Sequence, residues 1–351
     1  METFQIMNTE YLKIKGEHYH DAEIIDRAAR VIQDGGLVAI PTETVYGLAG
    51  SALNPTSAEK IYAAKGRPSD NPLIVHIAKP EEAETLAETN ETYYRLAARF
   101  MPGPLTIILP KKGIVPDEVT AGLDSVALRC PSNEIARKLI EVSGHPIAAP
   151  SANRSGIPSP TKAEHVLTDM DGRIDMIIDG GECDIGLEST VIKITDDGCI
   201  ILRPGAVTEE MLSEICGNVT VAKAVVEPGV AAEEKVESPG MKYKHYSPKA
   251  EVLLVDAAGD EFVEYVNNNS DNYCGVFTSN VERTKFKNAK TLITGENPSA
   301  RDESKSLFHL LRKADEMGLT KVYIKLPEAK GEYLALYNRL IRAAAGKIVK
   351  P

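Results

Sequence analysis

The chain has 351 residues, of which 43% are hydrophobic and 26% charged, and its formal net charge is −11. This length is enough for two domains of ordinary size, each with its own hydrophobic core. The acidic balance argues against a protein that mainly coats nucleic acid, and no apolar run is long enough to span a membrane. The N-terminal segment lacks the apolar core of a secretory signal, so we expect a cytoplasmic protein.

The N-terminal part begins with a helix and a buried strand. Apolar residues recur at helical spacing over residues 21–33, and Gly35 follows as a stop signal. Residues 37–40 form a short apolar run that is typical of a buried strand. A loop rich in hydroxyl groups comes next and includes Thr42 and Thr44.

A second polar loop follows a predicted helix. Thr56 and Glu59 form a capping-box pattern that predicts the start of this helix, and Gly66 marks its end. Lys65 and Arg67 flank that glycine. Two loops at neighbouring strand ends, one rich in hydroxyls and one with two basic residues, are suited to hold a polyphosphate.

Helices and strands interleave through the rest of this part. Short apolar runs predict strands at 73–77, 105–109, 126–128, 147–149, 176–178, 191–194 and 200–202, and helices are expected at 81–89, 91–101 and 133–143. The elements do not alternate strictly, so we expect a mixed sheet with helices packed on it. This domain should span residues 1–220.

A linker is predicted at residues 221–249, where no hydrophobic period is sustained. Its second half, SPGMKYKHYSP, places Tyr243, His245 and Tyr246 between two Ser–Pro dipeptides. Two readings stay open: a segment with a role at a site, or a linker whose rings rest on the domain surface.

Residues 250–351 form a cleaner α/β pattern. Strands are predicted at 251–255, 274–278, 290–294 and 322–325, and amphipathic helices at 304–318 and 332–346. The pattern indicates a smaller Rossmann-like domain with a parallel sheet. Because it has no GxGxxG fingerprint, nothing here indicates a dinucleotide.

Several chemistries lack their motifs. The chain has no P-loop, no HExxH and no GxSxG elbow. Its cysteines are widely spaced without a CxxC pair, which favours reduced thiols over disulfides or a zinc site. These cysteines are Cys130, Cys183, Cys199, Cys216 and Cys274.

Further loops with small hydroxyl side chains follow later strands. They are PSANRSG at 150–156, GLEST at 186–190 and RPG at 203–205, and a capping-box pattern at Thr161 and Glu164 predicts a helix start. Stiff loops of this kind offer hydroxyl and N–H groups to an anion, although each could be an ordinary turn.

Basic residues also gather at predicted loop–strand junctions. They are Lys65, Arg67, Arg129 and Arg203. In an acidic protein this recurrence favours a shared anion site over four independent surface charges.

Five ordered motifs resemble the YrdC-like family of threonylcarbamoyl-adenylate synthases. They are PTETVYGL, KGRPSDNPL, SANRSGIPSPT, ESTV and RPG. The linker and the C-terminal α/β domain resemble the longer, two-domain form, so the resemblance covers residues 15–351.

The resemblance implies an open, twisted mixed sheet around a deep positive cavity. It also implies a nucleotidyltransferase that makes L-threonylcarbamoyladenylate from L-threonine, bicarbonate or CO₂, and ATP, with release of pyrophosphate. Other proteins would then transfer the threonylcarbamoyl group to a tRNA adenosine, with at most weak tRNA binding by this chain and no membrane partner. Mg²⁺ would be held by the phosphates of ATP and not by protein side chains.

The resemblance also implies roles for individual residues. Thr44, His76, Arg129, Ala149 and Ser189 match positions that hold L-threonine. Lys65, Arg67, Asn71, Ser125, Ser151, Ser159 and Arg203 match positions around ATP, and Tyr243 and Tyr246 would close over the nucleotide as part of a lid.

The chemistry agrees with these residue types. The carbamate of threonine is already an anionic nucleophile, so alignment and charge neutralisation are the main requirements. We assign that neutralisation to Lys65 and Arg67 as catalytic residues, pair Arg129 with the threonine carboxylate, and expect Glu43 to be a structural partner and not a base.

Two alternatives remain. A carbamoyl-adenylate-forming transferase shares the first domain's motifs but usually carries zinc-finger and acylphosphatase modules that are absent from this sequence. A non-catalytic RNA-binding module would use the basic cavity, but the acidic charge and the lack of interleaved aromatic and basic residues argue against it.

Overall fold

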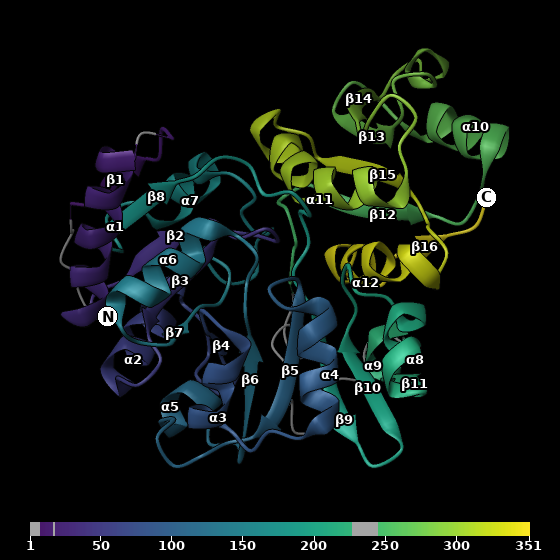
Figure 1. Cartoon of the computed structure of the whole chain (residues 1–351). Coiled ribbons are helices and arrows are strands. Elements are labelled where there is room, and N and C mark those ends of the chain that lie inside the picture. Colours follow the sequence, from purple (N-terminus) through teal and green to yellow (C-terminus); the bar gives the residue numbers. More distant parts are fainter. Residues whose placement is uncertain (1–7, 17, 227–244) are drawn as a thin grey trace.

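The computed structural model describes residues 8–16, 18–226 and 245–351, which form two α/β parts, each built on its own sheet (Figure 1). The larger sheet has 11 strands in the order β1-β8-β2-β3-β7-β4-β6-β5-β9-β10-β11, and the smaller has 5 in the order β14-β13-β15-β12-β16. The predicted class, a twisted mixed sheet with a smaller Rossmann-like α/β domain, is confirmed. Within these residues, no helix has the length and hydropathy of a membrane span.

The larger sheet contains parallel and antiparallel pairs. Its strands are β1 (Glu10–Lys13), β2 (Val38–Ile40), β3 (Gly47–Ser51), β4 (Ile74–His76), β5 (Leu105–Pro110), β6 (Ser125–Arg129), β7 (Ile147–Ala148), β8 (Met176–Asp179), β9 (Thr190–Thr195), β10 (Gly198–Arg203) and β11 (Asn218–Val221). Its helices are α1 (His18–Gln33), α2 (Pro55–Lys65), α3 (Ala83–Leu86), α4 (Glu91–Phe100), α5 (Asp117–Thr120), α6 (Glu134–Ser143), α7 (Ala163–Met170), α8 (Glu209–Cys216) and α9 (Lys223–Val226).

The smaller sheet is parallel throughout its described pairs. Its elements are β12 (Glu251–Val255), α10 (Gly259–Asn269), β13 (Cys274–Thr278), β14 (Lys290–Ile293), α11 (Ala300–Glu316), β15 (Lys321–Lys325), α12 (Leu334–Ala343) and β16 (Ile348–Val349). Strand β15 lies between β13 and β12, so the strand order differs from that of a standard dinucleotide-binding fold.

Alternating side chains place helices on both faces of the smaller sheet. Val252 and Leu254 pack in one cluster with α11 and α12, whereas Leu253 and Val255 pack in another with α10. Successive side chains of a strand point to opposite faces, so these clusters define three layers.

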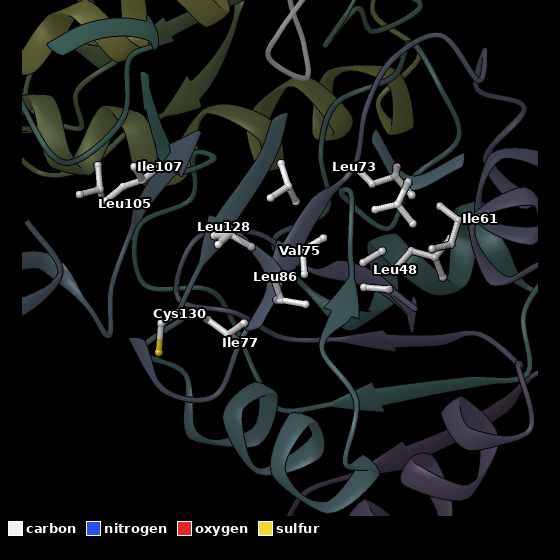
Figure 2. Packing of buried hydrophobic residues seen from close by; sticks show 14 of the residues in the cluster. Leu48, Ile61, Leu73, Val75, Ile77, Leu86, Leu105, Ile107, Leu128 and Cys130 are labelled. Carbon is white, nitrogen blue, oxygen red and sulfur yellow. The ribbon is translucent and has the colours of Figure 1, made fainter. Parts of the chain in front are cut away.

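The larger sheet has helices on both faces, but one region of it serves the site. Figure 2 shows Val75, Ile77 and Leu128 packing on the face that α2, α4 and α7 cover. The alternate residues of β4 and β6, among them His76 and Arg129, therefore point to the other face. The alternation of these two strands thus supplies a buried core on one side and polar groups on the other.

Two predicted capping boxes are wrong. Asn54 caps α2 by accepting from the Thr56 backbone N–H, because the helix begins one residue earlier, at Pro55. Helix α7 begins at Ala163, after Lys162, which makes no side-chain cap bond. The predicted helix at 81–89 is a 3₁₀ turn (Pro80–Glu82) followed by the short α3.

Candidate active site

A cavity of about 60 Å³ lies where the polar loops of the larger part meet. This enclosed space has room for only a few water molecules, and the pocket is open to solvent beyond it. Most predicted site residues line it: Thr44, Lys65, Arg67, His76, Arg129, Ala149, Ser151, Ser159, Arg203 and Tyr246.

Lys65 is held at one wall of the cavity by carbonyl groups. It is the last residue of α2, which Gly66 ends in the left-handed conformation at φ 60°. Its Nζ donates to the carbonyl oxygens of Ser151 and Asn153, the latter at 2.6 Å. Burial and the nearby Arg67 charge lower the pKa of Lys65. Lys65 therefore joins the first basic loop to the later hydroxyl loop.

Arg67 shapes the other side of the same turn. Its Nη2 donates to the carbonyl oxygens of Asn71 and Pro72, at 3.2 and 3.1 Å. Asn71 itself does not line the cavity. Its side-chain amide is buried and makes no hydrogen bond to a described residue, which is unusual for a buried polar group.

Two of the five residues predicted to hold threonine lie on neighbouring strands. His76 and Arg129 are register partners in the parallel β4–β6 pair, and Ala149 donates its backbone N–H to the Ile74 carbonyl at 3.0 Å. The Thr44 and Thr42 hydroxyls are 2.8 Å apart. The strand register therefore brings a ring, a guanidinium and hydroxyls together.

Arg129 forms a buried ion pair with Glu43. The Nη2 and Oε1 atoms are 2.8 Å apart, but they are not aligned as a hydrogen bond. Arg129 Nε also makes no hydrogen bond among the described residues. Glu43 thus pairs with Arg129, and Arg129 keeps donor capacity beside the cavity.

His76 is held neutral in this environment. Burial, followed by the Arg129 charge, lowers its pKa to about 3. Its Nδ1 is 3.2 Å from the Ile74 carbonyl oxygen. A neutral imidazole can therefore accept or donate a hydrogen bond in the cavity without adding positive charge.

Ser189 lies beside the cavity but does not line it. Arg203 donates to its hydroxyl and to its carbonyl oxygen, both at 3.0 Å, and its hydroxyl is 2.7 Å from that of Thr106. Burial lowers the pKa of Arg203 to about 10, so the side chain remains charged at neutral pH. Ser189 therefore fixes Arg203 at the cavity wall.

Ser125 is not brought to the cavity. It begins β6 and pairs with Pro110, whereas the cavity residue Arg129 ends the same strand. Tyr243 lies outside the described residues, as does most of the predicted lid. His245 and Tyr246 line the cavity, and Tyr246 stacks on Phe308 of α11 with ring centroids 5.1 Å apart.

Sequence reasoning missed the contribution of the C-terminal part. Glu188 lines the cavity and accepts from the Ser159 hydroxyl at 2.6 Å and from Arg339 Nε of α12 at 2.8 Å. Figure 1 shows α12 beside α9 and β10, close to this wall. The available signal was a charged residue on the apolar face of α12, between Leu336 and Leu340.

The site gathers four basic side chains, small hydroxyls and a neutral imidazole around one cavity beside a mixed sheet. Such an arrangement defines an enzyme-like anion site in a two-part α/β protein. The chain belongs to the Sua5/YciO/YrdC family. The model of that family, described as "Telomere recombination", matches residues 30–205, and that of the "Threonylcarbamoyl-AMP synthase, C-terminal domain" matches residues 207–345.

Similar proteins cover nearly the whole chain. The threonylcarbamoyl-AMP synthase of Pyrococcus abyssi is 43% identical over 335 residues, covering 92% of this chain and 94% of the relative. That of Bacillus subtilis is 41% identical over 330 residues, covering 93% and 94%. The crystal structure of P. abyssi Sua5 with L-threonine has a TM-score of 0.87 at 40% identity and covers 98% of this chain and 100% of that one.

Proposed function

We infer that this protein is an L-threonylcarbamoyladenylate synthase. It joins L-threonine, bicarbonate or CO₂, and ATP, releases pyrophosphate, and so catalyses the first step of threonylcarbamoyladenosine formation in tRNA. The observation that carries this conclusion is the placement of Lys65, Arg67, Arg129 and Arg203 around one cavity, in a chain similar to threonylcarbamoyl-AMP synthases over more than nine-tenths of its length.

The chemistry needs alignment more than a nucleophilic side chain. The amine of threonine adds to CO₂ to give a carbamate, a carbamate oxygen attacks the α-phosphorus of ATP, and the bond from that phosphorus to the β-phosphate oxygen breaks as pyrophosphate leaves. In our proposal Lys65 and Arg67 neutralise the leaving phosphates. Their separate carbonyl contacts favour this role, because both cations are fixed before ATP arrives.

Threonine lies, in this proposal, against β4 and β6. The donor groups of Arg129 take the carboxylate, and neutral His76 and the Thr44 hydroxyl bind the remaining polar groups. Ser151, Ser159, Arg203 and Asn71 are assigned to ATP. Ser125 has no contact with the cavity that supports its predicted ATP role.

ATP enters as its Mg²⁺ complex in this proposal. Glu188, the carboxylate that lines the described cavity, is bound by Arg339 and Ser159, and the nearby Glu43 pairs with Arg129. These residues do not form a magnesium site, so the metal would be carried by phosphate oxygens. The acceptor of the product, weak tRNA contact and cytoplasmic location stay predictions.

The decisive test is pyrophosphate release from ATP by the full chain. We expect release only when threonine and bicarbonate are both present, with threonylcarbamoyl-AMP as the other product. Release without threonine would indicate a different adenylating enzyme. Salt-sensitive RNA binding without ATP turnover would favour the RNA-binding alternative.

A further inference from the structure

Among the residues that the structure describes, Arg339 is the largest side chain that is completely buried. It belongs to α12 of the C-terminal part, yet two of its hydrogen bonds cross to the larger part. Its Nε donates to Glu188 Oε2 at 2.8 Å and its Nη2 to the Pro204 carbonyl at 3.0 Å, while its Nη1 donates to Asn338 Oδ1 at 2.9 Å. Burying a guanidinium is costly unless it is paired in this way.

Glu188 connects Arg339 with the cavity. Its Oε1 accepts from the Ser159 hydroxyl at 2.6 Å, and both residues line the cavity. Burial alone would raise the pKa of Glu188, but the Arg339 and Arg203 charges and the Ser159 hydrogen bond outweigh it and hold the pKa below its ordinary value. Glu188 is therefore a carboxylate at neutral pH.

A carboxylate in this place poses an electrostatic problem. The surrounding cations suit a triphosphate, whereas an unpaired negative charge on the same wall would repel it, most strongly where water is excluded. The positive charge of Arg339, which comes from the C-terminal part, neutralises the charge of Glu188. Its guanidinium carbon also lies 5.7 Å from the centre of the Tyr246 ring, which lines the cavity too.

We propose that Arg339 is a positioning residue that the C-terminal part supplies to the active site. It neutralises and orients Glu188, so that Glu188 holds Ser159 in place without repelling the phosphates of ATP. The proposal rests on the proposed function only in requiring that ATP binds in this cavity. It gives the C-terminal part a direct effect on nucleotide binding.

The main experiment compares the Michaelis constants of ATP and threonine in the full chain. We expect Arg339→Met to raise the KM for ATP by about tenfold or more, since about 1.4 kcal/mol of lost interaction corresponds to tenfold. The KM for threonine should change much less, because within the described residues no hydrogen bond or ion pair joins Thr44, His76 or Arg129 to Glu188. Equal changes in both constants would overturn the proposal.

A second substitution tests whether the effect of Arg339→Met on the KM for ATP comes from the unpaired charge of Glu188 or from a general loss of structure. The second substitution Glu188→Gln, made in the Arg339→Met protein, removes the unpaired charge and keeps an oxygen that can accept from Ser159. We expect it to restore most of the affinity for ATP. A double variant with a KM for ATP as high as that of Arg339→Met, or higher, would contradict the proposal.

Asp169→Asn is the matched control. It removes the charge of another buried ion pair between the two parts, Asp169 with Arg312, whose Nη2 to Oδ2 distance is 2.6 Å. Asp169 does not line the cavity, although its charge favours the ammonium of Lys65, so the KM for ATP should rise much less than in Arg339→Met.

Folding is followed by thermal denaturation of every variant. Should Arg339→Met not fold, Arg339→Lys and the double variant decide the question. The lysine retains the charge and should keep the KM for ATP lower than the single methionine substitution would. The charge argument would be refuted if Arg339→Lys and the double variant both folded and both showed a raised KM for ATP with an unchanged KM for threonine. If the unchanged protein released no pyrophosphate with threonine and bicarbonate present, the proposed function itself would be refuted.

Discussion

Lys65 shows how one residue can serve both folding and chemistry. Its ammonium is buried where two carbonyl oxygens of the 151–153 loop converge, so it fixes the loop that also carries Ser151. A compact point charge suits this place, whereas the planar fork of arginine requires more room and different acceptors. The lowered pKa of Lys65 reflects the cost of burying that charge.

We expect Lys65→Met to reduce kcat/KM for ATP by about a hundredfold, because it removes a fixed cation and frees the hydroxyl loop. Lys60→Met is the control. Lys60 lies on the same helix and donates to the Gly35 carbonyl at 2.7 Å, but it does not line the cavity. Steady-state kinetics of both variants test the difference, and equal losses would show that Lys65 acts only through helix α2.

At the scale of elements, one glycine makes the RPG loop fit the ESTV loop. A Cβ on Gly205 would lie 2.4 Å from the Thr190 backbone nitrogen and 2.8 Å from the Glu188 carbonyl oxygen. Backbone atoms cannot move aside cheaply at such distances. The close approach positions Glu188 and Ser189 directly beside Arg203.

We therefore expect Gly205→Ala to lower the free energy of unfolding by about 1–3 kcal/mol, as overpacking usually does. It should also weaken substrate binding, since the loop that carries Glu188 must shift. Gly113→Ala, where the added Cβ meets nothing within 4 Å, is the control. Urea denaturation measures both variants, and a neutral result at Gly205 would mean that the two loops separate at little cost.

Element type was easier to predict than element ends. Apolar runs gave β4, β5 and β9 nearly in full, because buried strands need continuous apolar residues. Strand β3 was missed, since GLAGS is glycine-rich and resembles a turn although all five residues are buried. The predicted cap at Thr56 failed because Asn54, another good capping residue, lies two positions earlier, and the one at Thr161 failed because α7 begins after Lys162 without a side-chain cap.

The ordered sequence motifs predicted those site residues that reach the cavity from the motif's own loop. Lys65, Arg67 and Arg203 line the cavity, and each lies where a loop joins a helix or a strand, which can be recognised in the sequence. The Arg339–Glu188 pair could not be predicted from the motifs, because its two residues are 151 positions apart and meet only through the packing of the two parts. Ser125 begins β6 and does not line the described cavity, so its predicted role at ATP stays a prediction.

At the scale of the whole molecule, two buried ion pairs among the described residues join the parts. Arg339 meets Glu188 near the cavity, and Arg312 meets Asp169 between α11 and α7. Removing one member of a buried pair leaves an uncompensated charge. The contact between the parts should therefore be sensitive to single substitutions.

We expect Arg312→Met to lower the free energy of unfolding by about 3–5 kcal/mol, because Asp169 is left buried and Pro158 loses its donor. Arg312→Met combined with Asp169→Leu should recover much of this loss. Urea denaturation of the three proteins gives the comparison. Additive losses in the double variant would show that packing, not charge, dominates this contact.

The buried imidazoles of His76 and His165 and the partly buried one of His245 link the stability of the whole molecule to pH. Burial, together with Arg129, Arg312 and Arg67 respectively, lowers the pKa values of His76, His165 and His245 to about 3 each, from an ordinary value of 6.5. Below pH 6.5 these histidines are protonated in the unfolded chain but stay neutral in the native protein. The stabilisation is thus complete above pH 6.5 and declines towards pH 3.

The slope of that decline counts the histidines. Each contributes about 1.4 kcal/mol per pH unit once its unfolded form is protonated. We therefore expect these three, together with His309, whose pKa burial also lowers, to reduce the free energy of unfolding by several kcal/mol between about pH 7 and about pH 5. This window lies above the range in which carboxylates titrate. His165→Gln should reduce the slope by about one proton, whereas His20→Gln, on the partly exposed end of α1, serves as the control. Urea denaturation across the window measures the slope. A free energy of unfolding that stays constant over it would mean that protonated imidazoles are accommodated without unfolding, against the burial seen here.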